Sequence, residues 1–283
     1  EWVLRALCRL RGRRLPVDHQ AELSRVSVLL TVHNEASKLE GRIADVFAGD
    51  YPANLLDVIV ASDGSTDGTD EIALRLQATM PVRLVRSGGR RGKTGTQNIA
   101  IPEASGEIIV FTDVDARFKS DFLREIVAPF ADPRVGGATG KLQLMQDETG
   151  VSRSQGFYWC YELRLRELES DLGILAVASG QAMAVRKSAW RPMPEDVGED
   201  CIVPLDVILG GSVMCHRAGA IAYDQFESES GKEFRTRVRM TLRNWVGTWR
   251  RPTLLNPFRN PGLSFALLSH KILRWISPFF III

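Results

Sequence analysis

Short apolar segments recur along the first part of the chain, each followed by a polar turn and then by a helical pattern. The segment at 108–112 carries β-branched and aromatic side chains at successive positions, without a helical period. Such a run is typical of a strand that is buried on both faces inside a parallel sheet. Three earlier segments of this kind, at 27–31, 56–61 and 82–85, predict three more strands joined by helical or loop crossovers. The pattern favours an α/β fold with a mainly parallel central sheet flanked by helices.

The second part of the chain mixes strands and helices. Apolar periodicity predicts strands at 138–144, 181–186 and 212–218 and helices at 122–130, 157–170, 202–209 and 233–249. At 263–273 an apolar face lies opposite His270 and Lys271. This pattern is typical of an amphipathic helix that lies along a membrane surface.

Composition excludes a disordered chain and a small disulfide-stapled one. With 283 residues and 45% hydrophobic side chains, the chain can bury a full core. Its four cysteines lack the close spacing of zinc sites or disulfide frameworks, which favours a reducing compartment.

The net charge of +2 is unevenly spread, since arginines crowd both ends of the chain. Basic clusters beside apolar segments are typical of the cytoplasmic side of a membrane, and we favour this over nucleic-acid binding. The apolar run at 275–283 is shorter than the ~20 residues of a spanning helix. We expect the cytosolic part of an integral membrane protein, with a basic juxtamembrane segment at 1–24 and an α/β domain at 25–232. The region at 233–283 is expected to hold the basic helix, the interfacial helix and the start of a membrane segment.

Two acidic side chains, Asp113 and Asp115, follow the 108–112 strand directly. They lie at the carboxyl end of that strand, the edge of an open α/β sheet at which ligands bind. Carboxylate oxygens suit Mg²⁺ or Mn²⁺, which bind phosphates through one or two carboxylates together with the phosphate oxygens. The pattern indicates a divalent-metal site, and a pair of solvated loop acids is the alternative.

Asp63 follows the second strand in a turn rich in Gly, Ser and Asp, and its place beside the first strand end indicates a ligand contact. The alternative is a cap for the helix near Thr69, for which Asp67 is better spaced. Lys93 follows the glycine-rich loop at 88–92 and starts a helix, where backbone N–H groups and an ammonium can bind phosphate. The P-loop spacing and a G-x-G-x-x-G after the first strand are both missing, which argues against an ATPase and a Rossmann dehydrogenase.

Two later groups could complete a site. Glu199 and Asp200 lie between a proline-rich loop and a helix, and they could supply a base or only stabilise the helix N-terminus. The basic helix carries Arg239, Arg243 and Trp245, which could clamp a diphosphate or form a solvated or lipid-facing stripe.

The joint order of these motifs resembles that of the family 2 glycosyltransferases, especially the membrane-embedded synthases related to hyaluronan, chitin, cellulose and poly-N-acetylglucosamine synthases. The resemblance runs from about 27 to 245. It implies a GT-A fold, a nucleotide-sugar donor that is usually a UDP-sugar, a divalent metal, and transfer with inversion at the anomeric carbon.

The resemblance also implies which residues bind the donor. The segment at 31–35 is similar to the family's opening nucleotide-binding loop, although Tyr is common where this chain has His33. Asp63 is similar to the acid that contacts the nucleoside, and Lys93 with Asn98 match an element near the diphosphate. The donor-binding residues implied are Thr31, His33, Glu35, Asp63, Lys93, Asn98 and Asp113.

The residues implied for the metal and the chemistry come from two acidic motifs. Asp113 and Asp115 resemble the family's Asp-x-Asp, the first near the ribose and the second on the metal. Glu199 and Asp200 resemble its Glu-Asp motif, in which the second acid is the general base. The Gln-x-x-Arg-Trp motif of processive synthases is not intact, and near its place stand, with altered spacing, Arg239, Arg243 and Trp245.

The sequence thus predicts a metal-dependent inverting glycosyltransferase that extends a polysaccharide or a lipid-linked sugar at the cytoplasmic membrane face. Inversion needs a carboxylate to take the acceptor proton, while metal and arginines stabilise the leaving diphosphate. A sugar nucleotidyltransferase would need a glycine-rich loop straight after the first strand, where this chain has His33, Asn34 and Glu35. A non-catalytic nucleotide-sugar sensor on the membrane would typically lose the base or the metal acid, and both are present.

Overall fold

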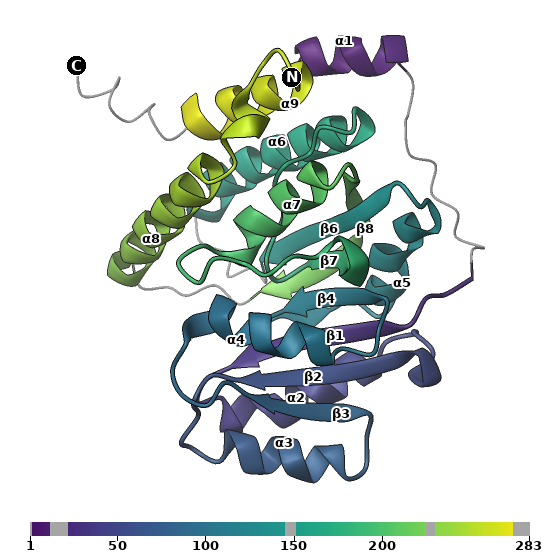
Figure 1. The fold of residues 1–283 in the computed structure, drawn as a ribbon, viewed down its shortest axis with the longest axis vertical. Helices are drawn as coiled ribbons and strands as arrows, with labels where there is room; N and C mark the ends of the chain where they lie inside the picture. The colour runs from purple at the N-terminus through teal and green to yellow at the C-terminus, as the bar shows by residue number, and fades with distance from the viewer. Residues whose placement is uncertain (1, 12–21, 145–150, 225–229, 274–283) are drawn as a thin grey trace.

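Eight strands form one mixed sheet, with helices packed on both of its faces (Figure 1). The computed structural model describes residues 2–11, 22–144, 151–224 and 230–273. Across the sheet the strands follow the order β3-β2-β1-β4-β7-β6-β8-β5. Their bounds are Val26–Val32 (β1), Leu56–Ser62 (β2), Val82–Arg86 (β3), Ile108–Thr112 (β4), Arg117–Phe118 (β5), Val135–Leu144 (β6), Met183–Arg186 (β7) and Val213–Asp224 (β8).

The half of the sheet that comes first along the chain is parallel throughout. Strand β1 pairs with β2 and β4, and β2 pairs with β3, all in the same direction. In this register Val32 lies opposite Ser62 and Leu30 opposite Thr112, so the three strands end near one edge. The predicted α/β fold with a mainly parallel sheet is confirmed.

The other half of the sheet contains two strands of opposite direction. Strand β7 is antiparallel to both neighbours, β4 and β6, and β5 is antiparallel to β8, whereas β6 and β8 are parallel. The sequence predicts β6, β7 and β8 but not β5, because two residues are too few to show a periodicity.

The helices separate into two layers and a C-terminal group. Helices α2 (Ala36–Phe47), α3 (Thr69–Gln77) and α5 (Phe122–Val127) cover one face of the sheet, and α4 (Gly92–Ala100) and α7 (Glu199–Leu209) cover the other. The remaining helices are α1 (Trp2–Arg11), α6 (Val151–Asp171), α8 (Ser230–Trp249) and α9 (Pro261–Ala266), which continues as the π-helical η6 (Leu267–Ile272). Short 3-10 turns are η1 (Ala53–Leu55), η2 (Ile101–Glu103), η3 (Ala128–Ala131), η4 (Lys187–Ala189) and η5 (Pro252–Leu255).

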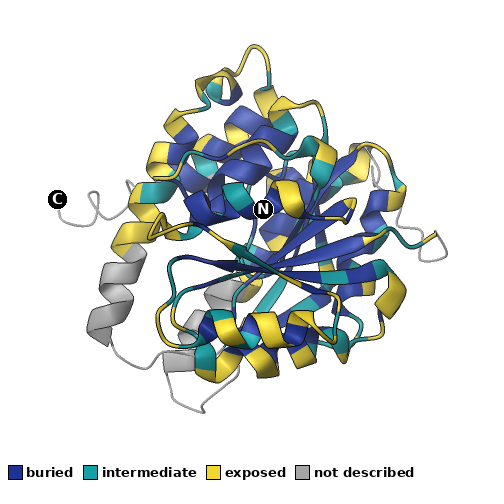
Figure 2. Ribbon diagram, turned by 60° about the horizontal axis from the view of Figure 1, so that its bottom comes forward, coloured by how far each residue is buried: buried dark blue, intermediate teal, exposed yellow. Residues whose placement is uncertain are grey.

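Alternate side chains of the central strands enter two separate cores. In β4, Ile108 and Val110 pack toward α2, α3 and α5, whereas Ile109 and Phe111 pack toward α4 and α7. The strand is therefore buried on both faces, which is the physical reason for its unbroken apolar run. Figure 2 shows the central strands in dark blue and exposed positions in yellow on the outer sides of the helices.

The C-terminal helices differ from the predicted amphipathic pattern. Lys271, which the pattern assigns to a polar face, is only 5% exposed, and its Nζ lies 3.8 Å from Sγ of Cys201 on α7. Phe265, Leu268 and Leu273 are exposed instead. The prediction is wrong for Lys271, because the spacing i, i+4, i+8 places this residue on the same helix face as the buried Leu263 and Leu267.

Two further expectations concern the ends of the chain. The structure shows α1 within the predicted basic segment, with Leu4 packed against Leu165 and Leu168 of α6. Within the residue ranges given above, no helix is both long and apolar enough to cross a membrane. The apolar run at 275–283, on which the predicted membrane segment depended, lies outside the described residues, and the predicted domain boundaries stay predictions.

Two glycines give a matched test of the packing. A Cβ on Gly106, just before β4, would lie 2.7 Å from the carbonyl carbon of Val26, whereas one on Gly41 in α2 would meet nothing within 4 Å. We expect Gly106→Ala to lower the free energy of unfolding by about 1–3 kcal/mol. Gly41→Ala should raise it by about 0.5–1 kcal/mol, because alanine is the better helix former. Urea denaturation of both variants measures this, and changes of equal sign would contradict the packing described.

Candidate active site

The residues that follow β1, β2 and β4 meet at one edge of the sheet. They are His33, Asp63 and Asp113. His33 Nδ1 lies 2.9 Å from the backbone oxygen of Asp63, and the N–H of Asp63 donates to the backbone oxygen of Val32 over 2.9 Å. Asn34 continues this edge with a φ of 58°, a conformation that asparagine tolerates better than most residues. The strand ends therefore converge as the sequence predicts for a ligand-binding edge.

The side chain of Asp63 forms hydrogen bonds that hold the glycine-rich loop before α4 in place. The side chain is buried, and Oδ1 accepts hydrogen bonds from the N–H groups of Arg91 (2.7 Å) and Gly92 (3.1 Å) and from Thr96 Oγ1 (3.0 Å). The alternative of a cap for α3 is wrong, because Asp67 accepts the N–H of Thr69 instead. A contact between Asp63 and the nucleoside stays a prediction.

Lys93 forms ion pairs with two acids, Asp113 and Glu199, that lie far apart in the sequence. Its Nζ lies 2.6 Å from Asp113 Oδ1, after β4, and 2.5 Å from Glu199 Oε1, at the start of α7. Burial by itself lowers the pKa of Lys93, but the charges of Glu199 and Asp113 outweigh it and hold the pKa well above its usual range. Because Glu199 is only 5% exposed, this ammonium is what neutralises its buried charge.

Asp200 stands next to this ion pair, in the first turn of α7. Burial of its carboxyl group, followed by the charge of Glu199, raises the pKa of Asp200 to about 6, while Lys93 and Lys271 act in the opposite direction. The residue at the helix N-cap is Gly198, and no side chain caps the helix there by a hydrogen bond. A carboxyl group with its pKa close to neutrality suits proton transfer, and the role of Asp200 as a base stays a prediction.

Asp113 and Asp115 provide oxygen donors that fit a small divalent cation. Asp113 Oδ1 is paired with Lys93, and Asp115 Oδ1 lies 2.7 Å from Lys38 Nζ. The Oδ2 atoms of both acids accept no hydrogen bond from another described residue. Within the described part of the chain no group of three or more His, Cys, Asp or Glu side chains could hold a metal. The two carboxylates therefore suit an ion that completes its coordination with phosphate oxygens and water, as Mg²⁺ does.

The middle of the chain matches a known family. Residues 27–191, more than half of the chain, match the model of glycosyl transferase family 2. The chain belongs to this family. The predicted family and enzyme class are thus confirmed.

Relatives and solved structures agree with this assignment. The poly-beta-1,6-N-acetyl-D-glucosamine synthase of Staphylococcus epidermidis is 25% identical over 183 residues, which cover 64% of this chain and 43% of that protein. The chain therefore spans less than half the length of this curated relative. The mannosyltransferase PcManGT from Pyrobaculum calidifontis, solved with GDP-Man and Mn²⁺, has a TM-score of 0.74 at 24% identity, covering 95% of this chain and 80% of that one. S. aureus TarS 1–349 in complex with UDP-GlcNAc has a TM-score of 0.55 at 17% identity, over 73% of this chain and 60% of that one. These likenesses confirm the GT-A fold.

Two predicted donor-binding residues of the glycosyltransferase, Asn98 and Thr31, differ in whether their side chains already have a hydrogen-bond partner. Asn98 Nδ2 donates to the backbone oxygen of Met193 over 2.7 Å, and Asn98 Oδ1 accepts the N–H of Met193 over 2.8 Å, so this amide fixes the loop that leads to α7. Thr31 Oγ1, by contrast, is buried and has no hydrogen-bond partner in the described residues. An unpaired buried hydroxyl at the end of β1 suits a polar group of a bound nucleotide.

The basic helix α8 is attached to the site through its C-terminal part. Cys201 of α7 donates through Sγ to the backbone oxygen of Asn244 over 3.5 Å. Arg239 is exposed, Arg243 is half-buried and Trp245 lies 5.9 Å from Trp249 between ring centroids. No hydrogen bond or ion pair of the described residues joins either arginine to the acids, so the diphosphate clamp stays a prediction.

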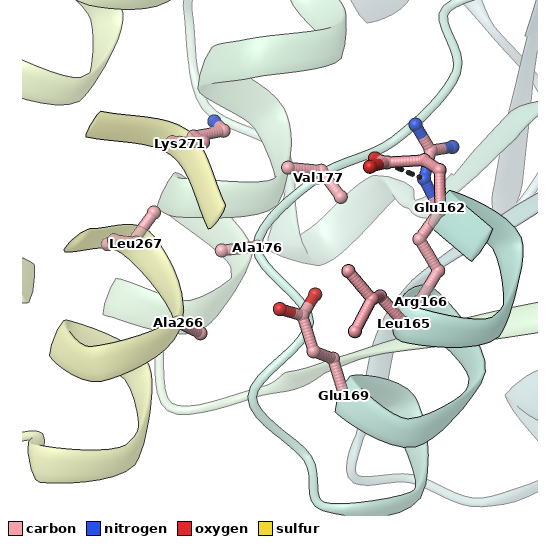
Figure 3. A pocket seen from close by; sticks show the side chains of 9 residues that line it. All are labelled: Glu162, Leu165, Arg166, Glu169, Ala176, Val177, Ala266, Leu267 and Lys271. Carbon is pink, nitrogen blue, oxygen red and sulfur yellow. Dashed lines mark hydrogen bonds and ion pairs between the residues drawn. The ribbon is translucent and has the colours of Figure 1, made fainter. Parts of the chain in front are cut away.

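A small cavity separates α6 from the C-terminal segment (Figure 3). It is lined by Glu162, Leu165, Arg166, Glu169, Ala176, Val177, Ala266, Leu267 and Lys271. Its volume of about 30 Å³ has room for water molecules but not for a sugar ring. The cavity therefore belongs to the packing between α6 and the C-terminal helices and is not a substrate pocket.

Sequence reasoning missed three cations that shape the site, namely Lys38, Arg42 and Lys271. Lys38 gives no signal, because a lysine on a helix is usually solvated, whereas Lys271 stands four residues after the apolar Leu267, on the same helix face. Arg42 does give one, since it stands among the apolar positions Leu39 and Ile43 that α2 buries. A charge inside an apolar stripe indicates a buried partner.

The raised pKa of Asp200 predicts a pH-dependent stability. Folding raises this pKa from 3.8 to about 6, so between these pH values the folded protein binds more protons than the unfolded one, and stability falls as the pH rises. Asp200→Asn removes this loss, so the variant should be more stable than the wild type above about pH 6 and approach it near pH 4.

Asp206→Asn on the same helix is the matched control. Asp206 is buried and accepts two hydrogen bonds from Arg251, at 2.5 and 3.0 Å, so its substitution should destabilise the protein at pH 7. Thermal unfolding of both variants from pH 4 to pH 7 measures the difference, and a destabilised Asp200→Asn at pH 7 would refute the assigned environment.

Proposed function

We propose that this glycosyltransferase is a metal-dependent inverting enzyme that moves a sugar from a nucleotide-sugar to a growing polysaccharide or a lipid-linked acceptor. The observation that carries the proposal is the ion bridge of Lys93. It links an acid of the metal pair, Asp113, to Glu199, whose neighbour Asp200 has a pKa near neutrality. One cluster thus offers a cation for a diphosphate, oxygen donors for a metal and a base.

Asp200 is assigned as the general base. With a pKa of about 6 it is mostly ionised at pH 7, yet basic enough to accept a proton from an acceptor hydroxyl. As that proton passes to the carboxylate, the hydroxyl oxygen forms its bond to the anomeric carbon and the bond from this carbon to the diphosphate breaks. Attack on the face opposite the leaving group inverts the anomeric configuration.

The donor side is assigned to the strand-end residues. Lys93 carries a fixed positive charge beside Asp113 and would stabilise the negative charge that the leaving diphosphate gains. Asp113 and Asp115 would hold Mg²⁺ or Mn²⁺, which supplies Lewis-acid stabilisation to the same phosphate oxygens when it is bound. The similar fold of PcManGT, solved with GDP-Man and Mn²⁺, supports this use of the site. We favour a UDP-sugar donor because of the resemblance to polysaccharide synthases.

A cytoplasmic membrane face is proposed as the place of action. Phe265, Leu268 and Leu273 expose apolar side chains on the C-terminal helices, as do Trp245 and Trp249 on α8. Exposed apolar surface of this kind is typical of contact with a membrane or another protein. The acceptor is then a glycan or a lipid-linked sugar at the membrane. The chain would be part of a longer integral membrane protein, and nucleic acid would have no role in its activity.

Substitution of the metal acid tests the donor side. Substituting an outer partner of a metal ligand typically weakens metal binding about 10–100-fold. Asp115→Asn removes a proposed ligand itself, so it should weaken Mn²⁺-dependent binding of UDP-sugar by more than that. Asp121→Asn is the control, because Asp121 forms a similar exposed ion pair, with Lys119 at 2.6 Å, away from this edge. Calorimetry with and without Mn²⁺ measures the UDP-sugar affinity of both variants. UDP-sugar binding that stays metal-dependent in Asp115→Asn would contradict the assignment of Asp115 to the metal.

Substitution of the base tests the chemistry. Asp200→Asn should lower sugar transfer ~10²–10⁴-fold, because the amide cannot take the proton, while donor affinity stays near that of the wild type. Asp206→Asn should keep transfer at a temperature where it is folded. Transfer and UDP-sugar affinity are measured side by side, and near-normal transfer by Asp200→Asn would exclude the catalytic role. A wild-type protein that binds donor but transfers nothing would be a nucleotide-sugar sensor.

A further inference from the structure

Arg42 is a fully buried arginine directly beneath the metal acids. It lies on α2, its exposed fraction is 0%, and its guanidinium lies 4.0 Å from the centre of the Phe118 ring. Burial, the largest cause, lowers the pKa of Arg42 to about 10, so the group stays positively charged at neutral pH. A buried charge of this kind costs stability unless every donor is used, and a leucine at this position would be the cheaper way to fill the core.

The donors of Arg42 are directed at the residues where the metal-binding loop begins. Nη2 donates to Thr112 Oγ1 over 2.8 Å, and Nε donates to the backbone oxygen of Asp113 over 3.3 Å. Nη1 donates to Asp45 Oδ2, one turn further along α2. The guanidinium fork thus fixes both the last residue of β4 and the backbone that carries the first metal acid.

Asp45 extends the same contact to the other end of the loop. Its Oδ2 accepts the N–H of Phe118 over 3.3 Å, while Phe118 stacks on the Arg42 guanidinium. Between these anchors Arg117 donates to the backbone oxygens of Val114 and Ala116, both over 2.9 Å. The five-residue loop at 113–117 is therefore held at its start, at its end and within.

We propose that Arg42 and Asp45 act as positioning residues that hold the loop at 113–117 in the conformation that binds the divalent metal. This inference rests on the metal role proposed above for Asp113 and Asp115. Outer groups that hold metal ligands in place typically change metal affinity about 10–100-fold when they are substituted. A merely structural arginine would change the stability of the protein and leave the affinity of the folded protein for metal unchanged.

Arg186 offers a matched control within the same sheet. It also lies over a phenylalanine, at 5.5 Å from the Phe130 ring centre, and donates to two backbone oxygens, those of Phe130 (2.8 Å) and Val135 (3.3 Å). It pairs with Ile108, at the opposite end of β4 from Thr112. Lysine at either position keeps the charge but loses the fork that reaches several acceptors at once.

The test compares Arg42→Lys and Arg186→Lys in two measurements. The first is hydrogen–deuterium exchange of the amides at 113–117 in metal-free protein. The second is calorimetric titration of Mn²⁺ into protein saturated with UDP. We expect Arg42→Lys to speed the exchange of the loop and to weaken Mn²⁺ binding about 10–100-fold. Arg186→Lys should leave both at the wild-type level.

Each outcome decides the proposal. Wild-type exchange and affinity in Arg42→Lys, or equal losses in both variants, would overturn it. If Arg42→Lys does not fold, Thr112→Val removes one acceptor of Arg42 at nearly constant volume, and a variant with unchanged loop exchange would overturn it as well. If the wild type itself binds no Mn²⁺, the proposed metal function fails, whereas the exchange comparison still decides whether Arg42 holds the loop.

Discussion

A single ammonium group, that of Lys93, forms ion pairs with two carboxylates that come from opposite parts of the fold. Asp113 follows a parallel strand of the first half of the sheet, and Glu199 begins the helix that covers the second half. Glu199 is buried and Asp113 is half-buried, and removing the partner of a buried charge costs several kcal/mol, on the order of 3–5, so Glu199 in particular depends on this cation. The position of Lys93 is in turn fixed by Asp63, which holds the loop before α4 through backbone N–H groups. The geometry of the site thus depends on one chain of polar contacts that starts at the end of β2.

The same cluster explains why Asp200 differs from its neighbour. Glu199 takes the ion pair with Lys93, so the second carboxyl group faces a negative charge in a buried place, and its pKa rises to about 6. Two adjacent acids therefore acquire different protonation behaviour from their surroundings alone. This arrangement costs stability at neutral pH, a common property of functional sites, which the two cores on either side of the sheet offset.

The metal acids are supported from the opposite face of the sheet. The buried Arg42 forms a polar and aromatic cluster with the half-buried Asp45 and Phe118, beneath the loop that carries Asp113 and Asp115. Lys93 contacts Asp113 from the side of α4, so this loop lies between two cations on different helices. Helices α2 and α4 pack on opposite faces of the sheet. The strand ends therefore lie between Lys93, which faces the proposed diphosphate, and Arg42, which supports the loop from the other face.

The sequence by itself determined seven of the eight described strands, a mainly parallel sheet flanked by helices, and the acids at the strand ends. Runs such as 108–112 show burial on both faces, and a residue that follows a parallel strand must lie at the carboxyl edge, so Asp63, Asp113 and Asp115 could be identified. Only the tertiary structure decided that Lys93 bridges to Glu199, that Arg42 is buried under the loop, and that Lys271 faces α7. The physical reason is that periodicity reports which face of an element is buried, whereas an ion pair depends on the distance between atoms from elements far apart in the chain. The β5 strand and the π-helical turn of η6 were not predicted, because they are too short or too irregular to leave a period in the sequence.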